Sequence, residues 1–528
     1  MKILGYKSGG HDGSIAFIDN GNLTYSIEAE KNGGARHDLF RAGALENVLE
    51  RWGSEPTIAC GDSHHFGSCD VGVYNGYSFD DIRWSKASIQ GRTIDYASVP
   101  HELAHIVGAV AMSELSAGQP CYVLLWEGYL GGIYYVDEAM NISPLVKDKP
   151  LILDFPGTRY LMPYHGTGRT GMFGHSAAGK IMAVAGLPID ESQDYSNEKE
   201  IAHRIATAKL SHDAGRIFLD GDCLELYKRL NYLRDVPVDD HRFIALCRAL
   251  QDEIFEIFYD FAKIHIDKKL PLVISGGCGL NCEWNTQWRD SGLFSEVFVP
   301  PVTNDSGIAI GCAATVQFLK TGNARINWDV YAGEKFIHET ENIEHLGYEK
   351  HPLDVDYLAE VLFEKGKVIA WVQGRYEIGP RALCHRSLIA SPLPLENRDE
   401  LNRIKIREYF RPVAPVCLEE DAEELFGWKG ASPHMLFFQK VKSDKLKAIT
   451  HFDGSARAQT MNEKQDHLFY QLLQACKRKS GYGVLCNTSL NFPGRGFINR
   501  TSELLEYVDQ RGISVFVIDD WIYVKKAW

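Results

Sequence analysis

The stretch HELAHIVGAVAMSEL at residues 101–115, followed by CYVLLWEGYLGGIYYV at residues 121–136, decides the fold class. The first stretch comes directly after Pro100 and is predicted to form a helix. The second has the pattern of a buried strand, a turn that contains glycine, and another strand. The predicted order of elements here is therefore helix, strand, glycine turn, strand.

Two histidines on the predicted helix indicate a metal site. His101 and His105 are four residues apart, so both imidazoles lie on one face of the helix and can reach one ion. Glu127, at the end of the following strand, can supply a third ligand. An HxxxH spacing by itself is more often a pair of ordinary core residues, so the metal site needs support from the rest of the chain.

The bulk composition describes an ordinary globular protein with more than one domain. A chain of 528 residues is too long for a single core, and 45% hydrophobic and 24% charged residues are typical of globular proteins. The net charge of -14 disfavours a general nucleic-acid binder, and 12 cysteines without a CxxC pair disfavour a disulfide scaffold. With no signal peptide and no apolar run of about 18 residues, we expect a cytoplasmic protein with no membrane partner.

The N-terminal segment is predicted to be a hairpin with a glycine-rich loop. Strands are expected at residues 2–6, 15–18 and 23–28, with Asn20-Gly21 as the hairpin turn. The loop at residues 8–14 contains His11 and Asp12, and its glycines let backbone N–H groups approach an anion closely. A plain tight turn remains the commoner explanation for one such loop.

Further phosphate-binding patterns follow in the middle of the chain. An amphipathic helix at residues 243–265 precedes a strand at 270–275 and a turn that contains Gly276, Gly277 and Asn281. Strand, glycine turn and helix N-terminus form a geometry that binds phosphate, and Lys180 in the predicted helix within 171–187 can also face one. Asp305, before a helix of small residues, either serves a cation or caps that helix.

Basic residues gather in the last third of the chain, beyond a boundary predicted between residues 336 and 352. There a helix at 355–365 and a strand at 368–372 lead into a stretch of 37 positions that is rich in basic residues, among them Arg375, Arg381, Arg386, Arg403, Lys405, Arg407 and Arg411. Lysines and arginines in turns suit a polyanion such as a nucleoside triphosphate better than a solvated helix face. Cys384 and His385 resemble a nucleophile pair, but no third orienting group is visible.

Several of these segments together resemble one enzyme family. Residues 373–387, 402–415 and 487–489 are similar to the C-terminal signature of the O-carbamoyltransferases that make carbamoylated antibiotics and nodulation factors. Segments similar to the family's N-terminal landmarks occur in the right order: His11-Asp12, His101/His105, residues 178–180, 275–281 and 305–307. Residues 7–13 and 126–128 look closest to the branch that carbamoylates a hydroxymethyl cephem.

The resemblance implies two modules and a reaction in two steps. Residues 1–345 would form a two-lobed domain of the actin/sugar-kinase/Hsp70-like type, similar to the tRNA threonylcarbamoyl-transfer protein. Residues 353–528 would form a YrdC-like α/β domain. In the second domain, carbamoyl phosphate and ATP, with Mg²⁺, would give carbamoyl-adenylate, and the first domain would transfer the carbamoyl group to a hydroxyl of a small natural product.

The resemblance also implies roles for individual residues. His11, beside Asp12, would be the general base, and a divalent metal, iron in the family, would be held by His101, His105, Glu127 and Asp305. The residues expected to bind nucleotide and carbamoyl phosphate are Arg381, Lys405, Arg411, Arg457, Ser489, Lys180, Gly276, Gly277 and Asn281. Glu127 stands where relatives are expected to have aspartate, and Cys384 where the signature usually has glycine. Iron(II), manganese and zinc all accept such ligands.

Two other functions remain open, and so does the acceptor. A sugar-kinase-like phosphotransferase would leave the C-terminal arginines and the metal pair unexplained, and an RNA-modification partner protein is disfavoured by the acidic charge. Acceptor specificity is expected in residues 64–95 and 150–240, whose aromatic residues include Tyr74, Tyr77, Trp84 and Tyr160. We expect no nucleic-acid partner, and the interpretation leaves room for a homodimer.

Overall fold

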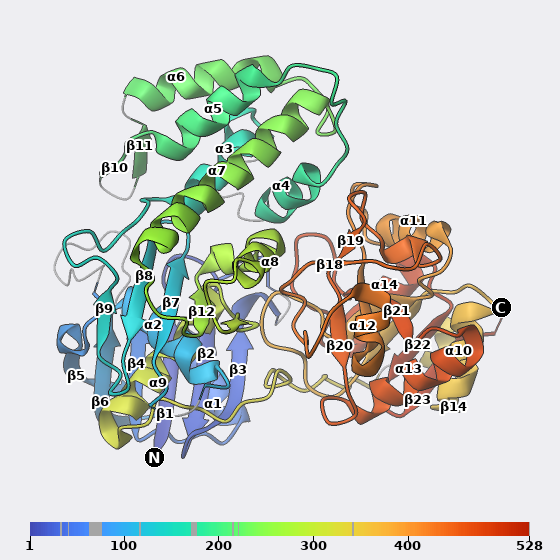
Figure 1. The fold of residues 1–528 in the computed structure, drawn as a ribbon. Helices are drawn as coiled ribbons and strands as arrows, with labels where there is room; N and C mark the ends of the chain where they lie inside the picture. Colours follow the sequence, from blue (N-terminus) through green and yellow to red (C-terminus); the bar gives the residue numbers. More distant parts are fainter. Residues whose placement is uncertain are drawn as a thin grey trace. The chain divides into compact units, whose positions relative to one another are not determined.

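The computed structural model describes residues 1–31, 34–40, 42–62, 76–115, 118–169, 177–213, 216–219, 221–340 and 343–526 (Figure 1). Within these ranges the chain is a mixed α/β protein that packs into two compact units. The first unit comprises residues 1–10, 18–21 and 48–327, and the second comprises residues 11–17, 22–47 and 328–528.

Two sheets form the base of the first unit. In one, β1 (Lys2–Lys7), β4 (Ile58–Asp62), β6 (Arg92–Val99) and β5 (Arg83–Ile89) are neighbours in that order. The other has the order β13 (Val297–Phe298), β12 (Leu272–Ser275), β7 (Cys121–Trp126), β8 (Gly131–Val136) and β9 (Ile142–Pro144). Strands β12 and β7 are parallel, and every residue of β7 is buried. The strand predicted at 121–126 is therefore confirmed.

Two helices with small residues pack closely in the first unit. The helix predicted at 101–115 is present as α2 (His101–Met112), and the helix predicted after residue 307 is α9 (Ile308–Thr321). A Cβ atom added to Gly311 would lie 2.0 Å from the carbonyl oxygen of Ala104, so only glycine permits this approach of the two backbones. The close packing brings the turn before α9 next to the first turn of α2.

The first unit contains six further α-helices among its described residues. The longest is α7 (His241–His265), which confirms the amphipathic helix predicted there, and its predicted apolar face is buried at Phe243, Leu250 and Phe258. The remaining helices are α3 (Pro156–Gly166), α4 (Ala177–Ala185), α5 (Ser196–Thr207), α6 (Gly221–Leu230) and α8 (Cys282–Asp290). Strands β10 (Leu210–Asp213) and β11 (Arg216–Leu219) pair in an antiparallel two-stranded ribbon.

The second unit contains a large mixed sheet. Its strand order is β14 (Tyr348–Pro352), β23 (Trp521–Lys525), β22 (Val515–Ile518), β15 (Ile369–Val372), β16 (Arg386–Ala390), β21 (Val484–Ser489), β17 (Ala414–Leu418) and β20 (Gln459–Met461). Along β15, Ala370 and Val372 belong to one apolar core while Ile369 and Trp371 belong to another. The strand thus separates two cores, as its alternating side chains require.

Helices and short hairpins complete the second unit. They are α10 (Val355–Phe363), α11 (Leu395–Ile404), α12 (Ala422–Phe426), α13 (His467–Ser480), α14 (Thr501–Arg511), and the pair β18 (Gln439–Lys440) and β19 (Ser455–Ala456). The helix and strand predicted at 355–365 and 368–372 are confirmed as α10 and β15. Most of β2 (Ser14–Asp19), with β3 (Asn22–Glu28) beside it, also belongs to this unit, and α1 (Ala42–Arg51) begins in it.

Among the residues that the structure describes, no helix is both long enough and apolar enough to span a membrane.

Candidate active site

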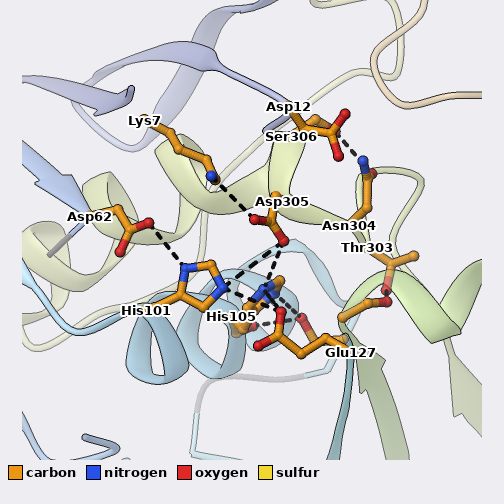
Figure 2. A network of polar contacts seen from close by, with 12 residues as sticks. Lys7, Asp12, Asp62, His101, His105, Glu127, Thr303, Asn304, Asp305 and Ser306 are labelled. Carbon is orange, nitrogen blue, oxygen red and sulfur yellow. Dashed lines mark hydrogen bonds and ion pairs between the residues drawn. The ribbon is translucent and has the colours of Figure 1, made fainter. Parts of the chain in front are cut away.

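Four buried side chains of the first unit converge on one point, and we call them the metal group: His101, His105, Glu127 and Asp305 (Figure 2). The first two turns of α2 supply the two histidines, the residue after β7 is Glu127, and the turn before α9 supplies Asp305. One ligand atom of each lies within 4.8 Å of all the others. Glu127 Oε2 is 3.3 Å from His101 Nε2 and 3.2 Å from His105 Nε2, and Asp305 Oδ1 is 3.5 Å from His105 Nε2.

Contacts at Nδ1 determine that each histidine presents its Nε2 to the centre of the metal group. Asp62 Oδ2 lies 3.0 Å from Nδ1 of His101, and Ser275 Oγ lies 3.1 Å from Nδ1 of His105. Because both Nδ1 atoms are engaged on the outside of the group, both Nε2 atoms face its centre. Two imidazole nitrogens and two carboxylate oxygens form a donor set that suits iron(II), manganese or zinc. The residues present therefore fit a divalent metal, and the ion's identity stays open.

The charges of the metal group also favour a cation. Burial opposes ionisation of Glu127, yet the two imidazoles hold the pKa of this carboxyl well below its ordinary value. Burial likewise opposes protonation of His101, but Asp62, Glu127 and Asp305 raise the pKa of its imidazole well above the ordinary value. The buried carboxylates thus favour positive charge at the centre of the group, and a divalent ion can supply that charge.

Two residues at strand ends complete the surroundings of the metal group. The buried ammonium of Lys7 lies 3.2 Å from Asp305 Oδ2 and donates to the carbonyl of Gly9 at 2.7 Å, so Oδ1 of Asp305 is the oxygen left for an ion. Lys7 ends β1 and Asp62 ends β4, its parallel neighbour. The sequence prediction missed both of these contacts, although polar residues at the ends of parallel strands are a usual sign of a site.

A second candidate site lies in the second unit, around the predicted base. Asp12 Oδ2 is 2.9 Å from Nδ1 of His11, as expected for neighbours in the glycine loop, but Asp12 Oδ1 is also 2.8 Å from Nδ1 of His37. Burial opposes ionisation of Asp12, but the two histidines hold the pKa of its carboxyl well below its ordinary value. No sequence pattern indicates His37, because its contact with Asp12 depends on the meeting of two loops.

A third candidate site is a group of basic side chains of the second unit, which we call the cation cluster: Lys405, Arg407, Arg411 and Arg457. Burial and the charges of Arg411 and Arg457 lower the pKa of Arg407 to about 9. Burial lowers the pKa of Lys405 well below its ordinary value, and Arg407 and Arg411 lower it further, as do Arg36 and Arg511.

Lys405 also brings β21 into the cation cluster. Its ammonium donates to the carbonyl of Ser489 at 2.6 Å and to that of Asn491 at 3.0 Å, and it contacts the side-chain oxygens of both residues. When an anion binds between neighbouring cations, it relieves their mutual repulsion and raises their pKa values again. Lys405, Arg411, Arg457 and Ser489 are thus brought together, whereas Arg381 lies in the loop between β15 and β16.

Other basic residues of the same region support the fold. Arg375 donates to the carbonyls of Gly333 and Ala332, and the buried Arg386 donates to the carbonyls of Gln373 and Gly374. Arg403 forms a surface ion pair with Glu400. Burial raises the pKa of the Cys384 thiol well above its ordinary value, which argues against a Cys384–His385 nucleophile pair.

The predicted glycine turn at residues 276–281 is shaped by packing. Gly276 has a left-handed φ of 98°, and an added Cβ would lie 2.4 Å from the carbonyl oxygen of Trp126. The side chain of Asn281 caps α8 by accepting from the backbone N–H of Glu283 at 3.1 Å. Around Gly277, by contrast, an added Cβ would meet no atom within 4 Å. Lys180 lies half-buried on α4.

The aromatic residues expected near the acceptor have different surroundings. Tyr160 is buried and donates to Gln251 Oε1 at 2.9 Å, so it packs in the interior. The ring of Tyr77 packs against that of Tyr134, at 5.4 Å between centroids. Trp84 is 44% exposed, and Lys320 Nζ lies 4.6 Å from its ring centroid. Tyr74 lies outside the described residues.

An α/β protein with a buried His/carboxylate group that could hold a divalent metal, and with a group of neighbouring cations, has features of an enzyme that handles anionic substrates. Comparison with known proteins identifies which class this is. The family description "Carbamoyltransferase N-terminus" matches residues 84–314, and "Carbamoyltransferase C-terminus" matches residues 359–525. The chain belongs to the carbamoyltransferase family, and it is a carbamoyltransferase enzyme.

The similarity to individual relatives extends over nearly the whole chain. The chain is 37% identical to the 3'-hydroxymethylcephem-O-carbamoyltransferase of Amycolatopsis lactamdurans, over 99% of both chains. It is 36% identical to the protein of the same name from Streptomyces clavuligerus, over 100% of both. Nodulation protein U of Rhizobium tropici is 31% identical over 96% of this chain and 94% of that protein.

One solved structure has a distant resemblance to the chain. Full-length HypF in its phosphate- and nucleotide-bound form covers 61% of this chain and 56% of its own length, with 14% identity and a TM-score of 0.33.

Proposed function

We propose that the protein is an ATP-dependent O-carbamoyltransferase of natural-product biosynthesis that activates and transfers its carbamoyl group in separate places. Residues 353–528, with a YrdC-like fold, form carbamoyl-adenylate. Residues 1–345, with a fold of the actin/sugar-kinase/Hsp70-like type, transfer the carbamoyl group to an acceptor hydroxyl. The near-complete match to two cephem carbamoyltransferases carries this proposal.

The cation cluster supports the activating step. Carbamoyl phosphate, ATP and water would give carbamoyl-adenylate, phosphate and pyrophosphate, and negative charge would build on the oxygens between the phosphorus atoms. Lys405, Arg411 and Arg457 would bind these oxygens, with Ser489 as a polar contact and Arg381 from the neighbouring loop. Ligand anions would restore the ordinary protonation of cations that burial and repulsion now disfavour. Lys180, Gly276, Gly277 and Asn281 would supply further anion contacts.

The histidines support the transferring step. His11 would accept the proton of the acceptor hydroxyl, because a neutral imidazole whose Nδ1–H donates to Asp12 presents a basic Nε2. The new bond forms between the acceptor oxygen and the carbamoyl carbon, and AMP leaves. His101, His105, Glu127 and Asp305 would hold a divalent metal, with iron(II) as the first candidate, whose Lewis acidity polarises the carbamoyl group.

The acceptor class follows from the relatives. The two cephem carbamoyltransferases described above are named for a hydroxymethyl cephem, so a primary hydroxyl on a small antibiotic scaffold is the first acceptor to test.

The test uses the purified full chain loaded with iron(II) under anaerobic conditions. It is incubated with ATP, Mg²⁺, carbamoyl phosphate and a panel of hydroxylated acceptors that includes a hydroxymethyl cephem. We expect AMP and pyrophosphate to appear only with carbamoyl phosphate, and the acceptor mass to rise by one carbamoyl group. Formation of ADP with a phosphorylated acceptor would instead identify a sugar-kinase-like phosphotransferase.

A further inference from the structure

Two histidines from separate loops share one carboxylate in the second unit. Asp12 Oδ2 lies 2.9 Å from His11 Nδ1, and Asp12 Oδ1 lies 2.8 Å from His37 Nδ1. The two imidazole rings are perpendicular, with an interplanar angle of 88° and 6.3 Å between centroids. Asp12 is buried, whereas both histidine side chains keep some contact with solvent, at 31% for His11 and 23% for His37. His37 is thus joined to the proposed base by one shared residue.

The backbone around this contact is held in an uncommon conformation. Asp12 and His37 both have left-handed φ angles, of 53° and 63°, which residues with a side chain rarely adopt. The two loops are tied by hydrogen bonds from the backbone N–H of Gly13 to the carbonyl of Asp38 at 2.8 Å and from that of Asp12 to the carbonyl of His37 at 3.4 Å. The backbone N–H of His37 also donates to Glu30 Oε2 at 3.1 Å. Strain that several contacts hold in place is characteristic of functional loops.

The shared carboxylate constrains the proton positions on both rings. The pKa of Asp12 lies well below its ordinary value, so the carboxylate is ionised at working pH and can only accept hydrogen bonds. Each Nδ1 that contacts it must therefore carry a proton. A neutral imidazole with its proton on Nδ1 has its lone pair on Nε2, which is the arrangement that a base needs.

We propose that His37 is a positioning residue for His11 in carbamoyl transfer. His37 donates from Nδ1 to Oδ1 of Asp12 and so fixes the plane of the carboxylate. Oδ2 of Asp12 then accepts from Nδ1 of His11, which keeps the lone pair of the His11 ring on Nε2. The acceptor's proton moves to that nitrogen as the bond between its oxygen and the carbamoyl carbon forms and AMP leaves. This role rests on the proposed function of His11 as the base.

Two substitutions at His37 separate the hydrogen bond from the backbone strain. His37→Gly removes the donor while glycine accepts the left-handed φ without strain. His37→Asn also accepts this φ, and its side-chain amide can donate from nearly the position of Nδ1. We expect His37→Gly to lower kcat for transfer by about tenfold to a hundredfold with KM for the acceptor little changed. His37→Asn should stay within about threefold of the unaltered enzyme, and carbamoyl phosphate-dependent AMP formation should be unchanged in both.

A measurement that needs no activity tests the positioning directly. Nitrogen-15 NMR of histidine-labelled protein reports which ring nitrogen of His11 is protonated, with His11→Gln used to assign its signals. The unaltered protein and His37→Asn should show the proton on Nδ1, and His37→Gly should show a mixture.

An unchanged tautomer in His37→Gly would overturn the proposal, as would equal loss of transfer in both variants at unchanged melting temperature. A second bound divalent ion that His37→Gly removes would overturn it in favour of a metal site. If the unaltered enzyme transfers no carbamoyl group, the proposed function fails, while the NMR result still decides the role of His37.

Discussion

The metal group of the first unit and the cation cluster of the second are electrostatically unbalanced in opposite directions. In the metal group, buried carboxylates raise the pKa values of His101 and His105 and call for a cation. In the cation cluster, burial and neighbouring cations lower the pKa values of Lys405 and Arg407 and call for an anion. Each region would therefore bind a ligand of the opposite charge favourably. In the proposed two-step reaction the steps would therefore depend on ligands of opposite charge, and each could be disrupted separately.

The largest effect should come from removing a ligand of the metal group. His105→Ala deletes the imidazole whose Nε2 lies 3.2 Å from Glu127 and 3.5 Å from Asp305, and leaves buried carboxylates without their partner. We expect transfer to the acceptor to fall by at least about a thousandfold, while carbamoyl phosphate-dependent pyrophosphate release stays within about twofold. Bound metal, measured on the same samples, should be lost.

The exposed His203, which pairs with Glu253 on the surface, offers the control, and His203→Ala should change neither half-reaction. Loss of both half-reactions in a folded His105→Ala protein would show that the two regions do not divide the chemistry.

The next largest effect should come from the cation cluster, with the half-reactions reversed. Lys405→Met keeps the length of the side chain and removes the charge that contacts Ser489 and Asn491. We expect pyrophosphate release to fall by about a hundredfold to a thousandfold, with bound metal unchanged. Transfer from chemically supplied carbamoyl-adenylate should persist.

Lys429, whose side chain is 79% exposed and pairs with Glu423, provides the matched control. If Lys429→Met lowers pyrophosphate release as much as Lys405→Met, general loss of positive charge rather than a built anion site explains the effect.

Part of this comparison could be predicted from the sequence, because it depends on local geometry. The spacing of His101 and His105 places both on one face of α2, and the buried pattern of β7 places Glu127 at a strand end. The approach of Asp305 could not be derived from spacing, since it depends on the packing of α9 against α2 through Gly311; the family resemblance supplied it.

The roles that the sequence could not assign depend on contacts between distant segments. Arg386 belongs to the same basic run as Lys405, but it is fully buried. Its guanidinium donates to the carbonyls of Gln373 and Gly374, so it has a structural role. Tyr160 was expected near the acceptor, yet it packs in the interior against Gln251. His37 meets Asp12 only because two loops with left-handed residues are tied together. Residue type indicates the chemistry that a side chain can perform, and tertiary packing decides whether it is used.

A smaller effect should come from the second contact of His101. Asp62→Asn keeps the shape of the side chain and removes the charge that lies 3.0 Å from Nδ1 of His101. We expect metal affinity to fall by about tenfold to a hundredfold, with transfer recovering when the metal concentration is raised. Competition with a metal chelator measures this affinity. Asp95, which pairs with Lys86 on the surface, gives the control Asp95→Asn, and equal effects of the two substitutions would show that Asp62 acts only through long-range charge.

The smallest effect should be a dependence of stability on pH that the cation cluster imposes. Lys405 has a pKa below its ordinary value of 10.5 in the folded protein, so the folded state binds fewer protons than the unfolded state between the two pKa values. The free energy of unfolding should therefore rise as pH rises through the folded pKa toward 10.5. Arg407, whose pKa is lowered to about 9, should add a slope of the same sign above that pH.

Pyrophosphate should reduce this slope, because an anion bound in the cluster raises the folded pKa values toward their ordinary range and stabilises the protein by mass action. Urea unfolding from pH 7 to pH 10, with and without pyrophosphate, measures the slope for the unaltered protein, Lys405→Met and Lys429→Met. The slope should be smaller in Lys405→Met alone, since that variant lacks the buried charge. A slope that is the same in all three proteins and insensitive to pyrophosphate would mean that the cations of this region are not poised for an anion, and the contrast with the metal group would then lose its electrostatic basis.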